Sequence, residues 1–333
     1  MSETRVGVGM PVYNAERYLR EAIDSFLGQT YPNFELTITD NASTDATEAI
    51  CREYAARDAR VRYHRSERNL GAIRNFRRAF ALADGEYFAW AAHDDLRAPT
   101  FLEACVGQLD ARPDAVLCCT GIRIIDAEGR EIPESVWPPT TRPVDGTLRD
   151  RVLALARARY WYDFYGLIRR SALERTRLPI AVWGFDVVVL LELLLQGEIA
   201  YVPSELFWYR VFPEKQQSDV AHGLAAPGEE DVYTSWSELS VELLAAIGRA
   251  PLPIRERAVF AREMLVNFSL RNELVSRGIG HDGLASARRA LTRRRPLRAL
   301  ELAALTATVD LTRPLYWLRR ARARLGRKLH VRH

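Results

Sequence analysis

Residues 5–47 read RVGVGMPVYNAERYLREAIDSFLGQTYPNFELTITDNASTDAT, and two hydrophobic periods alternate along them. Residues 5–13 and 33–40 are short runs rich in β-branched and apolar side chains. Between these runs, residues 15–29 carry large apolar side chains at helical spacing, namely Leu19, Ile23, Phe26 and Leu27. From residue 43 onward, Ser and Thr stand where a helix N-cap belongs. The stretch therefore predicts strand, helix, strand and helix in succession.

The same alternation continues as far as residue 119. Further strands are expected at residues 61–65, 85–92 and 114–119, and further helices at residues 71–84 and 100–113. Strands that alternate with helices in this way predict an α/β fold with a mostly parallel central sheet and helices on both faces. In such sheets the ligand lies beyond the carboxyl ends of the strands.

The pattern is looser after residue 120. It indicates a hairpin around residues 127–129, a strand-like run that begins at residue 164, a helix over residues 184–197 and two short strands within residues 198–212. From about residue 218 the chain is expected to be helical with loops. We therefore expect a sheet-containing domain of residues 1–215, followed by a helical C-terminal region of residues 216–333.

The composition is that of an ordinary globular protein, but the charge is unevenly spread. The chain has 333 residues, 48% of them hydrophobic and 27% charged, with a formal net charge of +4. Residues 281–333 hold thirteen Arg and one Lys against three acidic residues, so the first 280 residues are net acidic. An acidic body with a basic tail indicates that the tail meets an anionic partner.

Cysteine usage and the N-terminus favour a cytoplasmic protein. The four cysteines show neither CxxC spacing nor a His at zinc-finger distance, which favours reduced, buried thiols. The N-terminus lacks the basic and apolar regions of a signal peptide. No apolar run reaches the roughly 18–20 residues that span a bilayer.

A dinucleotide-binding loop is disfavoured at the first strand. The run GVGMPV at residues 7–12 places Val12 where the GxGxxG fingerprint needs its third glycine. Pro11 also lies inside the loop. This mismatch argues against a dinucleotide-dependent oxidoreductase.

Polar side chains instead follow the first two strands: Tyr13, Asn14, Glu16, Asp40, Asn41 and Ser43. A Tyr ring can stack on a nucleobase, and Asn both donates and accepts hydrogen bonds. Asp40 can accept a hydrogen bond from a base N–H. The structural alternatives are a turn at the end of the first strand and an Asx-turn with an N-cap after the second, which explains Ser43 but not Asp40.

The segment RNLGAIRN, residues 68–75, combines cations with a glycine. Arg68 and Arg74 could balance phosphate charge, and Gly71 allows a close approach of the backbone. A solvated turn is the alternative.

The segment AAHDD, which ends at Asp95, follows the fourth expected strand. If the strand has ended there, Asp95 can reach a cation bound to a diphosphate, since Mg²⁺ and Mn²⁺ take one or two carboxylates plus phosphate and water. His93 suits Mn²⁺ better than Mg²⁺, and zinc is disfavoured because no further His or Cys is nearby. Alternatively, Asp94 and Asp95 cap the helix that begins near Thr100.

Asp186 stands at the start of the apolar run FDVVVLLELLL. The structural interpretation is a helix N-cap. The functional one is a general base, because a carboxylate at the rim of an apolar pocket can have a raised pKa and take a proton from a hydroxyl.

Together these blocks resemble the family 2 inverting glycosyltransferases of the GT-A fold, from about residue 6 to about residue 210. The blocks that carry the resemblance are PVYNAERYLREAIDSFLGQTYPNFELTITDNASTDAT, RNLGAIRNF, ADGEYFAWAAHDD, GLIRRSAL and GFDVVVLLELLLQGEIAYVPSELFWYR. The first block is far more specific than any single short motif. Residues 1–215 would then be a GT-A catalytic domain that binds a nucleotide-sugar.

The resemblance also implies residue roles. The nucleotide and donor would be bound by Pro11, Val12, Tyr13, Asn14, Glu16, Asp40, Asn41, Ser43, Arg68, Gly71, Arg74, His93 and Asp94. Asp95 would ligate the metal at the family's DxD position, and Asp186 would be the catalytic base. Two departures stand out: His93 occupies a position where Asp is common, and Phe185 replaces the acidic residue that usually precedes the base.

The implied activity is transfer of a hexosyl group from a nucleoside-diphosphate sugar to a glycan or lipid-linked glycan, with inversion and with help from Mn²⁺ or Mg²⁺. Such enzymes serve cell-envelope polysaccharide biosynthesis. The competing hypothesis is a non-catalytic sugar-nucleotide-binding or interaction protein of the same fold. A nucleotidyltransferase is disfavoured because residues 1–30 contain no Lys for a phosphate loop.

The C-terminal residues 311–333 read as a basic amphipathic helix. Leucines recur near helical spacing among many arginines, and Tyr316 and Trp317 are typical of membrane interfaces. Such a helix suits an anionic membrane surface, which would place the protein peripherally on the inner face of the cell membrane. The alternative is a helix packed on the catalytic domain with a solvated Arg face. Nucleic acid is not an expected partner, because no known binding module is present.

Overall fold

The computed structural model describes residues 4–133, 146–158, 160–212, 236–270, 273–292 and 295–309. The chain divides into two compact units. The first comprises Met1–Arg151, Ala158–Ala181 and Phe185–Val232, and the second comprises Val152–Arg157, Val182–Gly184 and Tyr233–His333. The boundary expected after residue 215 lies outside the described residues.

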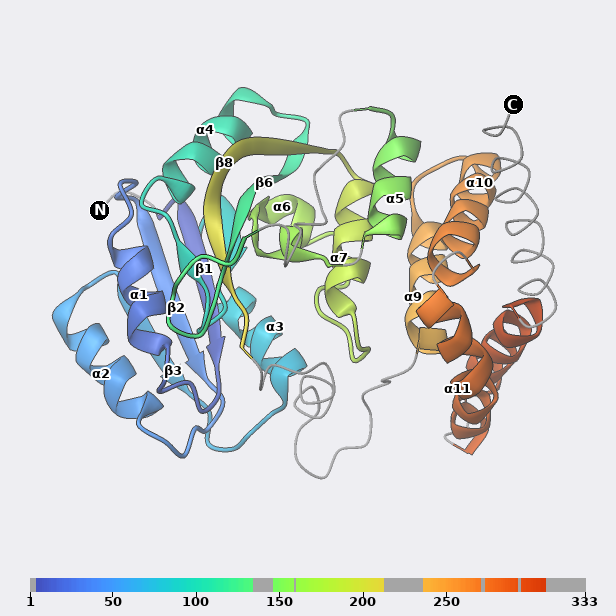
Figure 1. Cartoon of the computed structure of the whole chain (residues 1–333), viewed down its shortest axis with the longest axis horizontal. Coiled ribbons are helices and arrows are strands. Elements are labelled where there is room, and N and C mark those ends of the chain that lie inside the picture. The colour runs from blue at the N-terminus through green and yellow to red at the C-terminus, as the bar shows by residue number, and fades with distance from the viewer. Residues whose placement is uncertain are drawn as a thin grey trace, which may run out of the picture. The chain divides into compact units, whose positions relative to one another are not determined.

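A mixed eight-stranded sheet forms the centre of the first unit (Figure 1). Its strands are β1 (Val6–Val12), β2 (Phe34–Asp40), β3 (Val61–Arg65), β4 (Tyr87–Trp90), β5 (Leu96–Arg97), β6 (Ala115–Ile125), β7 (Leu167–Arg169) and β8 (Glu198–Arg210). They lie in the order β3-β2-β1-β4-β7-β6-β8-β5. The pairs β1–β2, β2–β3, β1–β4 and β6–β8 are parallel, and the pairs that involve β7 or β5 are antiparallel. The expected mostly parallel sheet is confirmed.

Helices cover both faces of this sheet. They are α1 (Leu19–Leu27), α2 (Thr47–Arg57), α3 (Ala72–Leu82), α4 (Phe101–Ala111), α6 (Arg170–Leu173), α7 (Phe185–Leu194) and the 3₁₀ helix η1 (Tyr162–Tyr165). A further helix, α5 (Leu148–Arg157), belongs to the second unit from Val152 onward. Three of the four apolar positions that predict α1 are buried, namely Leu19, Ile23 and Phe26, whereas Leu27 is half-buried. They share one core with the even-numbered side chains of β1 and with residues of α2 and α4.

The glycines of β1 allow α3 to pack closely on the other face. A Cβ atom at Gly9 would lie 2.8 Å from the Phe88 ring of β4 and 3.1 Å from Ala79 Cβ, and one at Gly7 would meet Asp84 O and lie 3.2 Å from Ala83 Cβ. Both alanines belong to the end of α3 or follow it directly. The Gly-x-Gly pattern therefore leaves room for the end of α3 and for the Phe88 ring.

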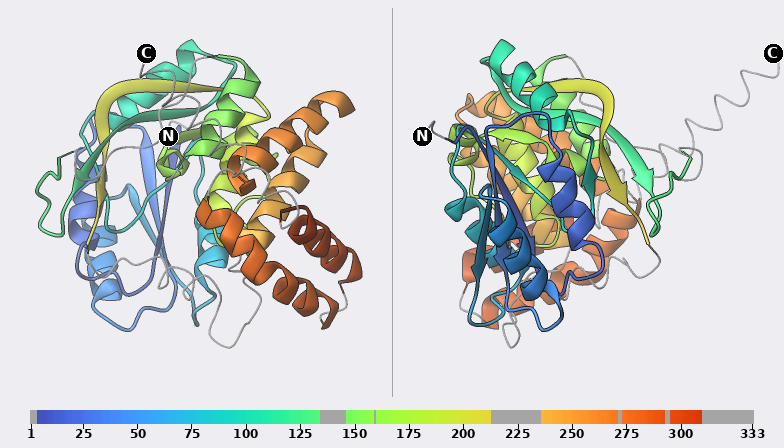
Figure 2. Two further views of the ribbon diagram at one scale, coloured as in Figure 1. Left: turned by 45° about the vertical axis from the view of Figure 1, so that its right-hand side comes forward. Right: turned by 90° about the vertical axis from the view of Figure 1, so that its left-hand side faces the viewer.

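The expectation of two short strands within residues 198–212 is wrong. One continuous strand, β8, runs beside β6 (Figure 2). The pairing register shifts at Thr120 and Gly121, where a Cβ on Gly121 would lie 2.6 Å from Pro203 O. Pro203 has no N–H for the ladder, and it lies with Ser204 in a bulge of β8 that leaves both residues without a partner in β6, so the strand continues past them.

Two smaller features complete the first unit. The expected turn after β6 is present: Gly129 N–H donates to Asp126 O over 3.1 Å, and Ile125 bridges to Glu131. The two-residue strand β5, which the sequence does not signal, pairs with the end of β8.

The second unit is helical in its described part. It contains α9 (Trp236–Arg249), α10 (Ile254–Met264), the π-helical turn η2 (Leu265–Leu270), α11 (Glu273–Thr292) and a helix over residues 296–309. Arg298 makes ion pairs with Glu238 and Glu242 inside it. Among the described helices, none is both long and apolar enough to cross a membrane. The amphipathic tail of residues 311–333 lies outside the described residues.

Candidate active site

The parallel strands bring most of the predicted residues to one edge of the sheet. In the register of β1, β2 and β3, Val12 lies beside Asp40, and Asp40 lies beside Arg65. β4 runs parallel to β1, so the loop that follows Trp90 leaves from the same edge. Pro11 and Val12 are the last residues of β1 and are buried.

The loops after β1 and β2 brace each other through hydrogen bonds. Asn14, in the left-handed backbone region with φ 48°, donates its N–H to Ser43 Oγ over 2.9 Å, and its Oδ1 accepts the N–H of Thr44 over 2.9 Å. Glu16 Oε2 accepts the N–H of Ala46 over 2.9 Å. The polar groups of Asn14 and Glu16 thus hold the shape of this edge. Tyr13, with 44% of its surface exposed, presents its ring outward.

Asp40 is fully buried at the tip of β2. Its Oδ1 accepts the N–H of Ser43 over 2.8 Å, and its Oδ2 accepts the hydroxyl of Tyr63 over 2.7 Å. Arg65 pairs with the same oxygen at 3.4 Å. Burial and the Asp40 carboxylate raise the pKa of Tyr63, which therefore stays a donor. The Asp40 side chain therefore holds the turn after β2 through the N–H three residues on, and α2 begins only at Thr47, after Ala46, so neither Ser43 nor Thr44 is its N-cap.

An asparagine network supports the loop between β3 and α3. Asn41 donates to Asn69 Oδ1 over 2.7 Å, and its own Oδ1 accepts the N–H of Leu70 over 2.8 Å. Asn75 donates from inside α3 to Val12 O and Thr39 O, over 3.3 and 2.8 Å. Asn75 ties the ends of β1 and β2 together. Its only sequence signal is a polar residue on the buried face of a helix.

The cations and the glycine of this segment stand around the start of α3. Gly71 precedes the helix with φ 80°, a backbone angle that favours glycine. Arg68 lies in the loop before it and Arg74 in the first turn, both exposed. Both arginines therefore stand near the N-terminus of α3, at the edge where β1, β2 and β3 end.

His93, Asp94 and Asp95 lie in the loop between β4 and β5. His93 is half-buried, whereas Asp94 and Asp95 are 6% and 1% exposed. Asp95 Oδ1 accepts the N–H of Arg210, at the end of β8, over 2.9 Å. Thr100, not either aspartate, precedes α4. The capping alternative for Asp94 and Asp95 is therefore not what the structure shows.

The chemistry of this loop fits a divalent metal that arrives with its substrate. Within the described part of the chain, no three His, Cys, Asp or Glu side chains gather closely enough to hold a metal ion alone. Mg²⁺ and Mn²⁺ usually take only one or two carboxylates and complete their shell with phosphate oxygens and water. Two neighbouring buried carboxylates match that requirement.

Asp186 lies in the first turn of α7 and is half-buried. Burial beside the apolar residues of the helix raises its pKa to about 6, and the N–H of Val187, 2.9 Å from Oδ1, offsets part of that rise. Phe185 precedes it as the first helical residue, so Asp186 is not the N-cap. The Phe185 ring packs on Phe76 of α3 and Phe164 of η1, at centroid distances of 5.4 and 5.6 Å. These ring contacts link the start of α7 to the sheet.

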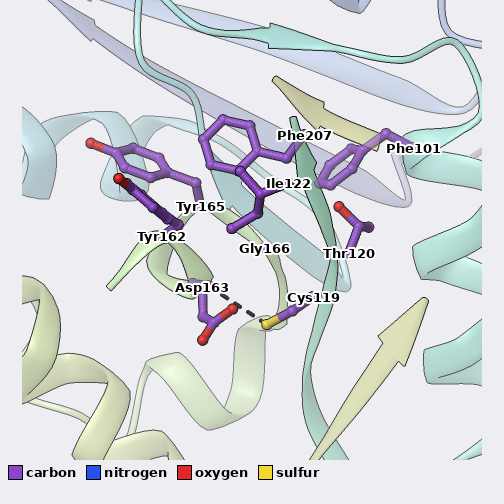
Figure 3. Close-up of a pocket in the computed structure, with 9 residues that line it drawn as sticks. All are labelled: Phe101, Cys119, Thr120, Ile122, Tyr162, Asp163, Tyr165, Gly166 and Phe207. Atoms are coloured by element: carbon purple, nitrogen blue, oxygen red, sulfur yellow. Dashed lines mark hydrogen bonds between the residues drawn. The ribbon is translucent and has the colours of Figure 1, made fainter. Parts of the chain in front are cut away.

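A small pocket in the first unit contains none of the predicted residues (Figure 3). Its volume is about 10 Å³, room for about one water molecule. Its polar lining comes from Thr120, Asp163 and Cys119, and the Cys119 thiol donates to Asp163 O over 3.9 Å. Burial raises the pKa of this thiol, so it stays protonated. The pocket is too small for a sugar ring and is a feature of the packing.

Comparison with known proteins identifies the family. The family model described as "Glycosyl transferase family 2" matches residues 7–177, just over half of the chain. The chain belongs to glycosyl transferase family 2. The matched residues of this glycosyltransferase include the β1–α1 and β2–α2 loops and the loop of His93, Asp94 and Asp95.

Relatives of this glycosyltransferase come from several bacteria. An uncharacterized protein of Mycobacterium tuberculosis is 29% identical to it over 262 residues, which span 72% of this chain and 74% of that protein. TuaG of Bacillus subtilis, named provisionally as a teichuronic acid biosynthesis glycosyltransferase, is 28% identical over 60% of this chain and 76% of its own length.

Solved structures share the fold. TarS 1–349 of S. aureus, in complex with UDP-GlcNAc, superposes with a TM-score of 0.63 at 18% identity, over 92% of this chain and 91% of that one. The mannosyltransferase PcManGT of Pyrobaculum calidifontis, in complex with GDP-Man and Mn²⁺, gives a TM-score of 0.53 at 16% identity, over 94% and 88%. The expected glycosyltransferase fold is confirmed.

Proposed function

We propose that this glycosyltransferase transfers a hexosyl group from a nucleoside-diphosphate sugar to a hydroxyl of a glycan or lipid-linked glycan, with inversion at the anomeric carbon. The observation that carries the proposal is the convergence of Asp40, the loop from Tyr13 to Glu16, and Asp94 with Asp95 at one edge of the parallel strands. UDP-GlcNAc in TarS and GDP-Man in PcManGT support a donor of this class. The name of TuaG supports a role in cell-envelope polysaccharide synthesis.

The donor nucleotide would occupy the edge formed by the β1–α1 and β2–α2 loops. Tyr13 offers an exposed ring on which a base can stack. A base N–H that reaches Asp40 would share Oδ1 with the Ser43 N–H, since each carboxylate oxygen can accept two hydrogen bonds and Oδ2 already accepts from Tyr63 and Arg65. Arg68 and Arg74 would lie along the diphosphate and balance its charge.

Asp95, with Asp94 beside it, would hold Mn²⁺ or Mg²⁺ at the diphosphate. His93 belongs to the same loop, two residues before Asp95. When bound, the ion supplies positive charge that stabilises the leaving nucleoside diphosphate. The Mn²⁺ in PcManGT supports a metal of this kind. Both carboxylates are buried, and the lower local dielectric there would strengthen their attraction to the cation.

Asp186 would act as the general base. A pKa of about 6 leaves the carboxylate ionised at pH 7 and makes it a stronger base than an ordinary aspartate. It takes the proton of the acceptor hydroxyl while an oxygen lone pair forms the bond to the anomeric carbon. The bond from that carbon to the diphosphate oxygen breaks, and its electron pair leaves with the nucleoside diphosphate. A single in-line displacement of this kind inverts the configuration.

The proposal is tested by incubating the purified protein with UDP- and GDP-hexoses, Mn²⁺ and a lipid-linked glycan extract. We expect release of nucleoside diphosphate that depends on the acceptor. NMR should show that the anomeric configuration of the new linkage is opposite to that of the donor sugar. Asp186→Asn should bind the same donor with no turnover. Donor binding without transfer to any acceptor would favour the non-catalytic hypothesis and overturn the proposal.

We further propose that residues 311–333 bind an anionic membrane surface, which would bring the enzyme to a lipid-linked acceptor. The support is the basic and leucine-rich sequence of this tail. The full chain should sediment with phosphatidylglycerol vesicles and should not sediment with phosphatidylcholine vesicles. A chain that ends at residue 310 should remain in the supernatant with both. Equal sedimentation of the two chains would overturn this role for the tail.

A further inference from the structure

Arg210 is a fully buried arginine at the end of β8. It contacts two consecutive residues of the loop between β4 and β5. Its backbone N–H donates to Asp95 Oδ1 over 2.9 Å, and its side-chain Nε donates to Asp94 O over 2.9 Å. The carbonyl of Asp94 and the carboxylate of Asp95 are thus held from the same residue, which restricts the backbone between them.

The rest of the guanidinium group is anchored on other elements. One terminal nitrogen donates to Ala127 O in the turn after β6, over 2.9 Å. The other donates to Glu21 Oε2 of α1 over 2.6 Å. The guanidinium carbon lies 4.4 Å from the centroid of the Tyr18 ring. Because these anchors belong to the sheet edge and to α1, they fix the position of the guanidinium group independently of the loop that it contacts.

A buried guanidinium group is costly unless its donors are satisfied, and here its planar fork reaches three separate segments. An ammonium group at the same place could not reproduce that geometry, because it lacks the fixed directions of the fork. The Asp94 contact is made by the side chain, so substitution removes it. The Asp95 contact is made by the backbone and remains.

We propose that Arg210 is a positioning residue that sets the direction of the Asp94 and Asp95 carboxylates toward a divalent metal and the donor diphosphate. This inference rests on the proposed function, in which those carboxylates hold the metal. Groups that orient metal ligands from behind typically change metal affinity about 10-fold to 100-fold when they are replaced.

The main variant is Arg210→Lys, and the chain offers a matched control. Arg170 also donates to two backbone carbonyls, Ala83 O and Phe80 O, over 2.7 and 3.3 Å, and to the carboxylate of Glu174 over 3.1 Å. Its guanidinium carbon lies 4.5 Å from the centroid of the Phe80 ring. Arg170 follows β7 directly, and its backbone N–H donates to Glu86 O, just before β4 begins. It therefore lies at the start of β4, whereas the loop of Asp94 and Asp95 follows the end of that strand. Arg170→Lys therefore removes the same kinds of contact at a place away from the loop of His93, Asp94 and Asp95.

A second variant guards against loss of folding. Glu21→Gln changes only the anchor of Arg210, and the Glu21 side chain is 56% exposed, so the fold should tolerate it. Each variant is first compared with the wild type by circular dichroism and by its urea midpoint.

The measurement is Mn²⁺ affinity, from the electron paramagnetic resonance signal of free Mn²⁺, at saturating UDP and, in parallel, at saturating GDP. Binding of the same diphosphate without metal is the second measurement. We expect Arg210→Lys to weaken Mn²⁺ binding about 10-fold and Glu21→Gln about 3-fold, with less than a 2-fold change in metal-free diphosphate affinity. Arg170→Lys should change neither affinity by more than about 2-fold.

Three outcomes would overturn the inference. A wild-type Mn²⁺ affinity in folded Arg210→Lys shows that Arg210 does not position the carboxylates. Equal losses in Arg210→Lys and Arg170→Lys show a general effect on the fold. If the wild type itself binds neither diphosphate with Mn²⁺, both the proposed function and this inference fail. The first two outcomes overturn only the inference about Arg210, because in them the wild type still binds Mn²⁺ with a diphosphate.

Discussion

Replacing Asp186 with Asn should abolish transfer and stabilise the fold at neutral pH. Burial raises the pKa of Asp186 from an ordinary 3.8 to about 6. A shift of about two units corresponds to about 3 kcal/mol against the ionised carboxylate in the folded state. Asparagine has nearly the same shape and carries no charge. The variant should therefore gain about 1–3 kcal/mol of unfolding free energy at pH 7.5, the lower value applying if water reaches the half-buried side chain.

The sign follows from proton linkage. A carboxyl group whose pKa is higher in the folded state binds its proton more tightly there than in the unfolded chain. The stability of the wild type should thus fall as the pH rises from about 4 to about 6, and the Asn variant should lack this contribution. Activity should follow the opposite direction, because the base must be ionised. Below about pH 6, kcat/KM of the wild type should fall about 10-fold per pH unit.

The assay is urea unfolding at pH 4.5 and 7.5, together with donor turnover over the same range. Asp45→Asn is the control of opposite sign. Burial raises the pKa of Asp45, but hydrogen bonds from Thr47 and from the backbone of Glu16 outweigh it and lower the pKa overall. Its ionised form is favoured by folding, so its replacement should destabilise the protein at neutral pH, by an amount that shrinks below about pH 3.8. Normal turnover in Asp186→Asn, or an unchanged stability difference between the two pH values, would refute the reasoning.

Three further predictions follow from the described contacts. Asp95→Ala should remove the increase in nucleoside-diphosphate affinity that Mn²⁺ causes, and identical calorimetric titrations with and without Mn²⁺ in both proteins would contradict the assignment. Tyr63→Phe should lower the free energy of unfolding by about 1 kcal/mol, because Asp40 Oδ2 loses a buried hydrogen bond of 2.7 Å; an unchanged urea midpoint would show that this bond does not stabilise the fold. Gly9→Ala should cost about 1–3 kcal/mol, since its Cβ atom would lie 2.8 Å from the Phe88 ring and 3.1 Å from Ala79 Cβ. A melting temperature equal to that of the wild type would show that the Phe88 ring and α3 can move aside.

Local patterns were sufficient for the layers of the sheet. The strand and helix periods of residues 5–119 place β1, β2, β3, β4 and the first part of β6 correctly, because a residue's period depends on near neighbours alone. β6 continues to Ile125, six residues past the end that its pattern predicts. They also place Asp40 and Asp95 just at or after strand ends. The same reasoning failed at residues 198–212, where pairing with β6 keeps one strand continuous through a bulge at Pro203 and Ser204.

The roles of Asp40, Asp95 and Asp186 stay predictions, but their surroundings could come only from the fold. Tyr63 is 23 residues from Asp40, and Arg210 is 115 residues from Asp95, so no local pattern joins either pair. The raised pKa of Asp186 likewise depends on which side chains pack around the start of α7.

The sequence by itself determined the α/β class, the alternation of elements and the chemical types at the strand ends, because hydrophobic period and turn chemistry act over a few residues. The tertiary structure decided which of those side chains meet, how deeply each is buried and what holds it. Those properties depend on strand order and on contacts between distant segments. Arg210 shows the difference: its sequence neighbours suggest only the end of a strand, and the role proposed for it depends on α1, the turn after β6 and the loop between β4 and β5 meeting around it.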